Sequence, residues 1–354
     1  FFFHAHAGKP DPLWSRGLGD VYKRQTVWFD NITQNSNVLD FDVVGVDTSV
    51  ANAIRRSILT NIPNVGFCHE PEEKCTITVK KNTTALHDEF ISHRISLLPL
   101  RRDAFNQTIP IENYTFKLEV TQNNFSIVTT DDFKVTVENA EGDETPLDPK
   151  LFFGHDNYSG NASIITRLPR KDASKDLEML EVECKAVRGS HENGAGFSPV
   201  SVCTMYENEN NKNTHHIMFE TIGTIPPKTI VLDAFNYLID KCEKILEKLS
   251  KDEYEINEAD ANFKGVDFIL DGETHTFGNM IYKWIYNEYI AKRNAVNKTG
   301  TKLLHVSYHE PHPLKKSITI RIGIDDSSDD YNACLLYTSP SPRDQRGSGG
   351  AGGG

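Results

Sequence analysis

The sequence predicts an α+β protein in which a strand-then-helix unit occurs twice, with a mainly β segment between the two copies. The first copy runs from Val38 to Thr60 and the second from Val266 to Ile290. Residues 102–199 hold short runs of β-branched and aromatic residues, separated by turn signals such as Glu141-Gly142-Asp143. Hydrophobic residues make up 38% and charged residues 25% of the 354 residues, which is typical of a folded protein.

The first unit joins a strand to an amphipathic helix. Val38–Val46 is rich in Val and Phe, as strands are. In the helix expected over Val50–Thr60, apolar residues recur every four positions and form one stripe, with small residues beside it. Residues 47–49 offer side-chain oxygens for the N-cap, and Pro63 stops the helix. The stripe consists of Val50, Ile54 and Ile58.

Further elements are expected up to the second copy. Leu86–Ile95 has helical spacing, with Leu86, Phe90, Ile91 and Ile95 on one face. A long helix over Lys228–Leu249 is followed by a charged linker over Lys251–Asn262. Alternating or β-rich runs predict strands at Cys75–Lys81, Tyr114–Val120, Phe133–Val137, Met179–Val187, Val200–Met205 and Ile217–Thr221.

The second unit repeats the order of the first. A strand at Val266–Leu270 precedes Thr276, an N-cap candidate, and a helix over Phe277–Ile290. Strands at Leu303–Tyr308 and Ser317–Ile324 follow. One helix face carries Phe277, Ile281, Trp284, Ile285 and Tyr289.

The two helices align with each other when Asn52 is paired with Asn279. Each then reads cap, apolar residue, small residue, Asn and an apolar stripe. Because the same patch serves both partners of an isologous contact, a repeated module predicts an intrachain pseudo-dimer. The expected seam consists of Val50, Ile54, Ile58, Phe277, Ile281, Trp284 and Ile285.

Charge and cysteine content limit the classes of function. The net charge of -12 does not suit direct binding of DNA phosphates. The six cysteines form no C-x-x-C pair, and no apolar run reaches the roughly 20 residues of a membrane-spanning helix. We therefore expect no zinc site of the usual spacing and no cofactor.

Both ends of the chain look foreign to the fold. Residues 1–25 and 331–354 resemble translated adapter sequence and are set aside. The domains expected in the rest are 26–101 plus 200–250, a β-rich insertion at 102–199, a linker at 251–262 and a smaller module at 263–330.

Several motifs carry a family resemblance. Asp47–Leu59 (DTSVANAIRRSIL) and Leu86–Leu100 (LHDEFISHRISLLPL) resemble the alpha motifs of cellular RNA polymerases. Leu180–Val187 and Phe197–Val200 resemble the return from that family's insertion domain. These segments are similar to the third subunit of eukaryotic polymerase II, or the archaeal D subunit. Glu273–Met280 (ETHTFGNM) and Tyr308–Leu314 (YHEPHPL) resemble the eleventh subunit, or archaeal L.

The resemblance implies a fused alpha-like subunit, as in the polymerases of large DNA viruses of eukaryotes. The implied fold is an alpha N-terminal-like dimerisation domain with a β insertion, followed by a second alpha-like module. The implied role is a non-catalytic assembly platform for the largest and second-largest catalytic subunits and for small subunits. The resemblance implies that the chain meets DNA only through the complex and binds no small-molecule substrate and no membrane. The implied location is the cytoplasm or nucleus of a eukaryotic host, or the virion. Partner contact is implied for Arg55 and Arg56 and expected for His93 and Arg94.

Two departures and three alternatives remain. The zinc and iron–sulfur ligand sets of some relatives are missing, and the C-terminal helix expected after Ile324 is replaced by acidic residues, which predicts a truncated sequence.

One alternative is an unfused-type alpha subunit that homodimerises through Val50–Leu59. Another is a free-standing metal enzyme that uses His215, His216, His309 and His312. The third is a secreted β-rich binding protein that uses the N-x-S/T sequons.

Overall fold

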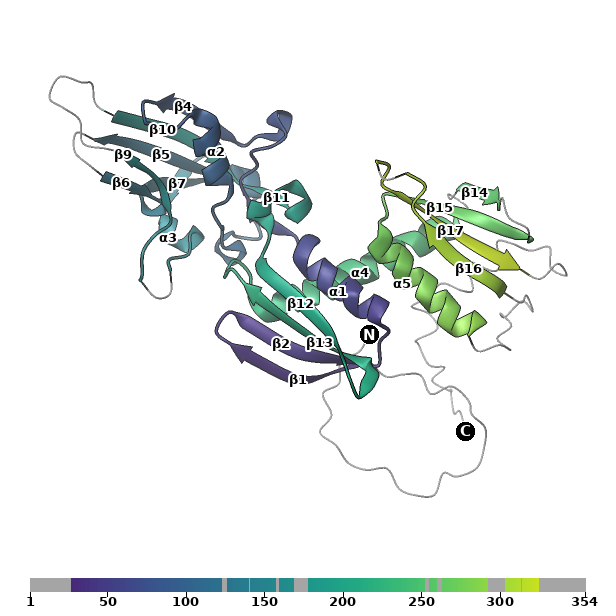
Figure 1. Cartoon of the computed structure of the whole chain (residues 1–354). Helices are drawn as coiled ribbons and strands as arrows, with labels where there is room; N and C mark the ends of the chain where they lie inside the picture. The colour runs from purple at the N-terminus through teal and green to yellow at the C-terminus, as the bar shows by residue number, and fades with distance from the viewer. Residues whose placement is uncertain are drawn as a thin grey trace, which may run out of the picture.

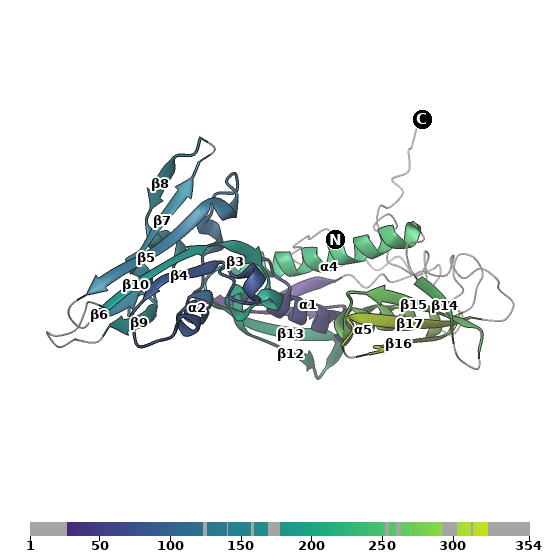
Figure 2. The same ribbon diagram turned by 90° about the horizontal axis from the view of Figure 1, so that it is seen from above.

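A computed structural model describes residues 27–324, except 123–125, 140, 157–158, 169–177, 252–254, 260–262, 292–302 and 313. The adapter-like ends and the expected truncation lie outside these residues. Three hydrophobic clusters divide the described chain into three units that follow one another in a row (Figures 1 and 2). The unit formed by the β-rich segment lies at one end, and the C-terminal unit at the other.

The middle unit is an antiparallel sheet with two helices packed on one of its faces. The strand order β1-β2-β13-β12 pairs the chain before α1 with the chain that returns from the insertion. Side chains from sheet and helices share one core, including Phe41, Ile54, Ile58 and Phe219. The elements are β1 (Trp28–Asn35), β2 (Val38–Val44), α1 (Thr48–Thr60), β12 (Val200–Asn208), β13 (Asn211–Thr221) and α4 (Pro227–Ser250).

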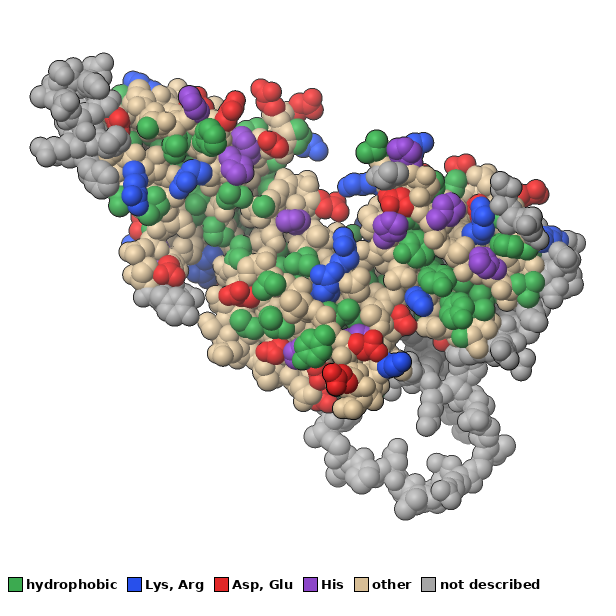
Figure 3. Space-filling model, in the orientation of Figure 1, with side chains coloured by type: hydrophobic (Ala, Val, Ile, Leu, Met, Phe, Trp, Pro, Cys, Tyr) green, Lys and Arg blue, Asp and Glu red, His purple; other side chains and the backbone are tan. Residues whose placement is uncertain are grey.

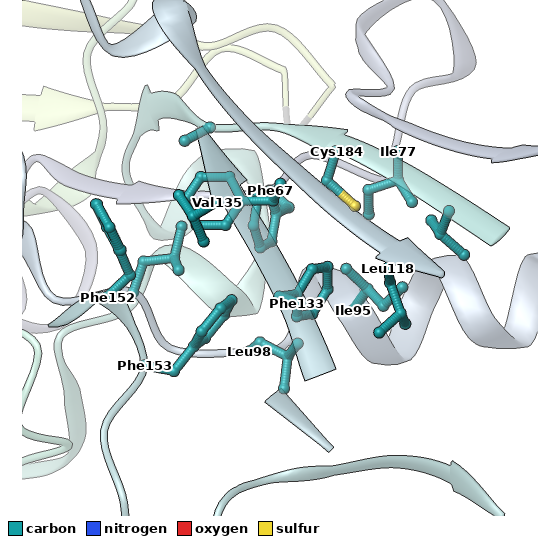
Figure 4. Packing of buried hydrophobic residues seen from close by; sticks show 14 of the residues in the cluster. Phe67, Ile77, Ile95, Leu98, Leu118, Phe133, Val135, Phe152, Phe153 and Cys184 are labelled. Carbon is teal, nitrogen blue, oxygen red and sulfur yellow. The ribbon is translucent and has the colours of Figure 1, made fainter. Parts of the chain in front are cut away.

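The β-rich unit packs its sheets and two helices, α2 and α3, around an aromatic core. Figure 4 shows part of this core, including Phe133, Phe152 and Phe153. The main sheet has the order β4-β10-β5-β7-β8, and two short pairs, β6–β9 and β3–β11, flank it. Phe116 contacts the rings of Phe67, Phe152 and Phe153 edge-on. The strands are β3 (Asn64–Gly66), β4 (Ile77–Asn82), β5 (Tyr114–Gln122), β6 (Ser126–Thr129), β7 (Phe133–Glu138), β8 (Glu144–Leu147), β9 (Ile164–Leu168), β10 (Glu178–Lys185) and β11 (Val187–Gly189). The helices are α2 (Asp88–Ser96) and α3 (Pro149–Phe152), with 3-10 turns η1 (Glu72–Lys74), η2 (Arg102–Ala104), η3 (Ile111–Asn113), η4 (Thr130–Asp132), η5 (His191–Asn193) and η6 (Ala195–Phe197).

The boundary of this unit lies earlier in the chain than the sequence predicts. Strand β4 pairs with β10, and Ile91 and Ile95 of α2 lie in the aromatic core. Residues 77–96 therefore belong to the β-rich unit, although the sequence assigns them to the first domain. The cause is long-range: β4 completes a sheet whose other strands lie up to about a hundred residues later.

A glycine-lined junction connects the β-rich unit to the middle sheet. The strand pair β3–β11 leads into η6, where the ring of Phe197 is 1% exposed. A Cβ at Gly66 or Gly189 would lie 3.1 or 2.8 Å from that ring, and one at Gly196 would lie 1.9 Å from the Ser96 carbonyl oxygen. Only glycine permits this approach to the end of α2.

The C-terminal unit is a second antiparallel sheet covered by one helix. Its order is β14-β15-β17-β16, and its core includes Phe268, Ile285, Ile320 and Ile322. The elements are β14 (Glu255–Glu258), β15 (Gly265–Asp271), α5 (His275–Ile285), a π turn η7 (Tyr286–Ile290), β16 (Leu303–His309) and β17 (Ser317–Ile324).

Two expectations for this unit need correction. The linker expected over 251–262 contains strand β14, whose four residues are all exposed and carry no alternating pattern to predict a strand. The N-cap of α5 is Thr274 rather than Thr276. The N-cap of α1 is Asp47. With Asn52 paired to Asn279, Ser49 aligns with Thr276, and each observed cap lies two residues earlier, so the register of the repeat is unchanged.

Candidate interhelical contact and partner-binding surface

Helix α1 is the central element of the described fold. It packs on β12, β13 and α4 of its own unit and contacts α5 of the C-terminal unit (Figure 1). The helix begins where the Asp47 side chain accepts a hydrogen bond from the Ser49 backbone N–H at 2.9 Å. Its buried residues include small ones, Ser49, Ala53 and Ser57, which allow neighbouring elements to approach closely.

The seven seam residues expected from the sequence lie mainly in the cores of their own units. Ile54 and Ile58 are buried in the middle unit's cluster, and Val50 packs against that cluster while partly exposed. In α5, Ile285 belongs to the C-terminal cluster, and Ile281 and Trp284 pack against it. Phe277 is also buried, at 3% exposed, but is not a member of that cluster. A role for these residues at the α1–α5 contact stays a prediction.

The small residues matched by the repeat are both closely packed within their own units. Ala51 is fully buried in the middle unit's cluster. A Cβ at Gly278 would lie 2.8 Å from side-chain atoms of Ile318 and Tyr308, both in strands of the C-terminal sheet.

A polar contact joins the start of α1 to the end of the α5 region. The Asn287 side-chain amide donates to the Asp47 carboxylate over 3.5 Å, a long hydrogen bond. Burial by itself raises the pKa of Asp47, but hydrogen bonds from Ser49 and Asn287 and the nearby Lys283 ammonium outweigh it. The net pKa of Asp47 is lowered, so the carboxylate stays charged at this contact.

An ion pair joins α4 to the turn before α5. The Lys241 ammonium lies 2.7 Å from a Glu273 carboxylate oxygen and 5.4 Å from the ring centroids of Tyr237 and Phe277. Burial by itself lowers the pKa of Lys241, but Glu273 and Tyr237 outweigh it and the pKa is raised. Burial also raises the pKa of Glu273, and Lys241 opposes that change. The Lys241 charge is therefore held by groups from both units.

Arg55 and Arg56 differ in their freedom to meet a partner. The Arg55 side chain is half-buried and donates through Nε to the Asn52 side chain at 3.0 Å. Arg56 is exposed, and within the part of the chain that is described its guanidinium has no hydrogen-bond or ion-pair partner. Figure 3 shows basic side chains over the α1 region in the middle of this face.

His93 and Arg94 lie on α2, in a different unit. Arg94 donates to the backbone carbonyls of Ile165 at 2.6 Å and Ile164 at 3.1 Å, which ties α2 to β9. The exposed His93 ring lies 5.7 Å from the His69 ring. Because α1 and α2 pack in separate cores, the structure does not bring these two residues together with Arg55 and Arg56 in one cluster.

Three residues at the contact between units were not predicted. Lys241, Glu273 and Asn287 are polar residues in helical or turn segments. Polar side chains in such segments are mostly exposed to solvent, so the sequence gives no reason to place these three at a contact. The only available signal was that Glu273 lies within the ETHTFGNM segment. Their role depends on which units meet, which the local sequence does not encode.

The described residues contain no group of three or more His, Cys, Asp or Glu side chains placed to hold a metal ion. His215 is fully buried and bonds Thr48 through Nε2 at 2.9 Å, while His216 bonds Asp42 at 2.8 Å. No described helix has the length and apolar character needed to cross a bilayer.

Comparison with known proteins gives a consistent family. The family model of the RNA polymerase Rpb3/Rpb11 dimerisation domain matches residues 40–242. The human DNA-directed RNA polymerases I and III subunit RPAC1 is 36% identical over 74 residues, covering 21% of this chain and 19% of that protein. Subunit Rpo3 of Thermococcus kodakarensis is 28% identical over 128 residues, 35% of this chain and 45% of that protein. RPB3 of Schizosaccharomyces pombe polymerase II is 31% identical over 81 residues, 23% and 24% of the two chains. In each case the matched region spans less than half of the relative's length.

Proposed function

Because the chain belongs to the RNA polymerase Rpb3/Rpb11 dimerisation domain family, we propose that it is a non-catalytic assembly subunit of a DNA-directed RNA polymerase. The observation that carries the proposal is the match over residues 40–242, which includes most of β2, helix α1 and the strands β12 and β13 of the middle sheet. The RPAC1, Rpo3 and RPB3 proteins to which the chain is similar are all polymerase subunits.

The proposal includes a pseudo-dimer within the chain, made of the middle unit and the C-terminal unit. Supporting it are the contact between α1 and α5, the matched register of their N-caps, and the Lys241–Glu273 ion pair. Joining two modules in one chain makes their association intramolecular, at an effective concentration of roughly millimolar for a short linker. By the resemblance, such a fusion is typical of polymerases of large DNA viruses, and that source is part of the proposal.

The proposed surface for the second-largest catalytic subunit is centred on Arg55 and Arg56. The exposed Arg56 guanidinium offers five donors in a planar fork, which suits a carboxylate or a row of carbonyls on a partner. Arg55 is held in place by Asn52 and would present a pre-organised neighbour. No catalytic residue is assigned to this chain, since the surface is suited to binding rather than to chemistry.

The test is capture of polymerase subunits by a tagged, co-expressed chain. We expect the two catalytic subunits from the same genome to co-purify, and the double variant Arg55→Ala/Arg56→Ala to retain its melting temperature while losing the second-largest subunit. Arg188→Ala, which removes an exposed arginine from β11, is the matched control. Absence of both catalytic subunits from the unaltered chain's complex would refute the assembly role.

A mass measurement separates the fused arrangement from a homodimer. The pseudo-dimer predicts a monomer in light scattering, since α1 already has its partner helix within the chain. A stable dimer that dissociates when Val50 is changed to Asp would instead favour the unfused-type subunit.

A further inference from the structure

One histidine is fully buried beside the first turn of α1. His215 of β13 is 0% exposed, and its Nε2 lies 2.9 Å from the Thr48 hydroxyl oxygen. Its Nδ1 is also buried, and among the described residues it has no hydrogen-bond partner. In a neutral ring Nε2–H donates to Thr48 and Nδ1 remains a bare acceptor, which is the arrangement that this site accommodates.

A proton on Nδ1 would be unfavourable at this place for two reasons. The new N–H would have no acceptor within a buried site, and an unsatisfied buried donor costs free energy. The positive charge would also lie at the N-terminal end of α1, where the helix dipole already carries partial positive charge. The fold therefore holds His215 in its neutral form.

Charged groups near the ring come from two neighbouring segments. On β2 the residue opposite His215 is the apolar Val43, and on β12 it is Glu207. Asp47 precedes α1 and also acts on the ring. Burial lowers the pKa of His215 from 6.5, and the two carboxylates oppose this change without reversing it. The neutral ring therefore contributes stability above pH 6.5, and that contribution is lost as the pH falls through the folded-state value.

Asp47 links this ring to the contact between units. Its carboxylate accepts from the Ser49 N–H at 2.9 Å, which caps α1, and from the Asn287 amide of the C-terminal unit at 3.5 Å. The Lys283 ammonium also acts on this carboxylate. A protonated His215 would compete with these donors for Asp47, because a charged donor forms a strong hydrogen bond with a carboxylate. The first turn of α1 and the contact with Asn287 would then weaken together.

We propose that His215 makes the contact between the middle unit and the C-terminal unit sensitive to pH. When the buried ring gains a proton, the start of α1 loosens and the contact between Asp47 and Asn287 opens. The inference rests on the pseudo-dimer of the proposed function and adds its regulation, since the two modules are held together near neutral pH and released in mild acid. Histidine is the side chain suited to this role, because its charge changes close to neutral pH.

The experiment is amide hydrogen exchange on the full chain, read in two segments that meet at this contact. They are residues 47–51 at the start of α1 and η7, which contains Asn287. We expect the protection factors of both segments, corrected for the intrinsic pH dependence of exchange, to fall about tenfold between pH 7.5 and 5.5 in the unaltered chain. In His215→Gln the fall should be less than about twofold, because the Gln amide keeps a donor for Thr48 but does not titrate.

The matched control is His216→Gln. His216 is the next residue of β13, lies on the opposite face of the sheet and bonds Asp42. Asp47 stays charged over the measured range, since its pKa is lowered from 3.8. Glu273, whose pKa is raised from 4.5 by burial, is present in all three proteins, so the difference between them reports His215.

Loss of protection in the unaltered chain and in His216→Gln, but not in His215→Gln, supports the inference. Protection that is independent of pH, or that falls equally in His215→Gln, overturns it and leaves the pseudo-dimer intact. Segments that are unprotected already at pH 7.5 overturn both. If His215→Gln does not fold, hydrogen exchange at the ring C2 position of His215 in the unaltered chain decides. Its titration must coincide with the loss of protection, and any other midpoint overturns the inference.

Discussion

The Lys241 ammonium of α4 lies 2.7 Å from Glu273, in the turn where α5 begins, although 32 positions separate the two residues in the chain. Only 22% and 11% of the two side chains are exposed. The pair stands where the long helix of the middle unit meets the C-terminal unit. At the other end of the same contact, Asn287 reaches Asp47. Two polar contacts therefore lie between the units, one at the start of α1 and one at the start of α5.

Removing the lysine should weaken the attachment of the C-terminal unit. Lys241→Met leaves the Glu273 carboxylate without its counter-charge, and we expect a loss of about 2 kcal/mol, below the roughly 3–5 kcal/mol for a fully buried pair. The double variant Lys241→Met/Glu273→Gln should recover part of that loss. Urea unfolding of the unaltered chain, of Lys241→Met and Glu273→Gln singly, and of the double variant gives the coupling energy. Additive losses would show that the pair is not coupled.

Asp47 should make stability depend on pH in the acid range. Its folded-state pKa is lowered from 3.8, so its contribution to the free energy of unfolding is present above pH 3.8 and is lost as the pH falls through the folded-state value. Asp47→Asn keeps an oxygen for the Ser49 N–H but carries no charge. The stability difference between the two proteins should therefore shrink as the pH falls below 3.8 in denaturant titrations. A difference that stays constant below pH 3.8 would contradict the assignment.

Gly196 should tolerate no side chain. In Gly196→Ala the new Cβ would lie 1.9 Å from the Ser96 carbonyl oxygen, and backbone must move to relieve the clash. We expect a loss of roughly 1–3 kcal/mol, as for other overpacked sites. Gly154→Ala is the control, since nothing lies within 4 Å of its added Cβ. Equal unfolding midpoints for the two variants would rule out the tight junction.

Three cysteines should resist alkylation in the folded protein. Burial raises the pKa of Cys203 to about 12 and that of Cys242 to about 11, and it raises the pKa of Cys184 further. Because the thiolate is the reacting species, iodoacetamide at pH 8 should modify them only after urea is added. Peptide mapping by mass spectrometry checks this, with the half-buried Cys75 as the faster-reacting comparison.

Much of the local structure follows from local patterns. The apolar stripe and cap residues predict α1 to within two residues, and alternation predicts β5, β7 and β17 closely. Strands β1 and β14 were missed because almost all of their residues are exposed, so no apolar face marks them. The candidate partner residues Arg55 and Arg56 came from the motif resemblance, whereas Lys241 and Asn287 belong to no motif, and the motif that contains Glu273 does not indicate its ion pair.

The sequence by itself determined the α+β class, the repeated strand-then-helix unit and its register, because caps and hydrophobic periodicity act over a few neighbouring residues. Only the tertiary structure decided that β4 and α2 join the β-rich unit, and that α2 turns Ile91 inward and Phe90 outward. It also decided that Lys241 finds Glu273 across two units. Such outcomes depend on which surfaces meet after the chain has folded back, and each apolar or charged side chain has several local neighbours it could equally face.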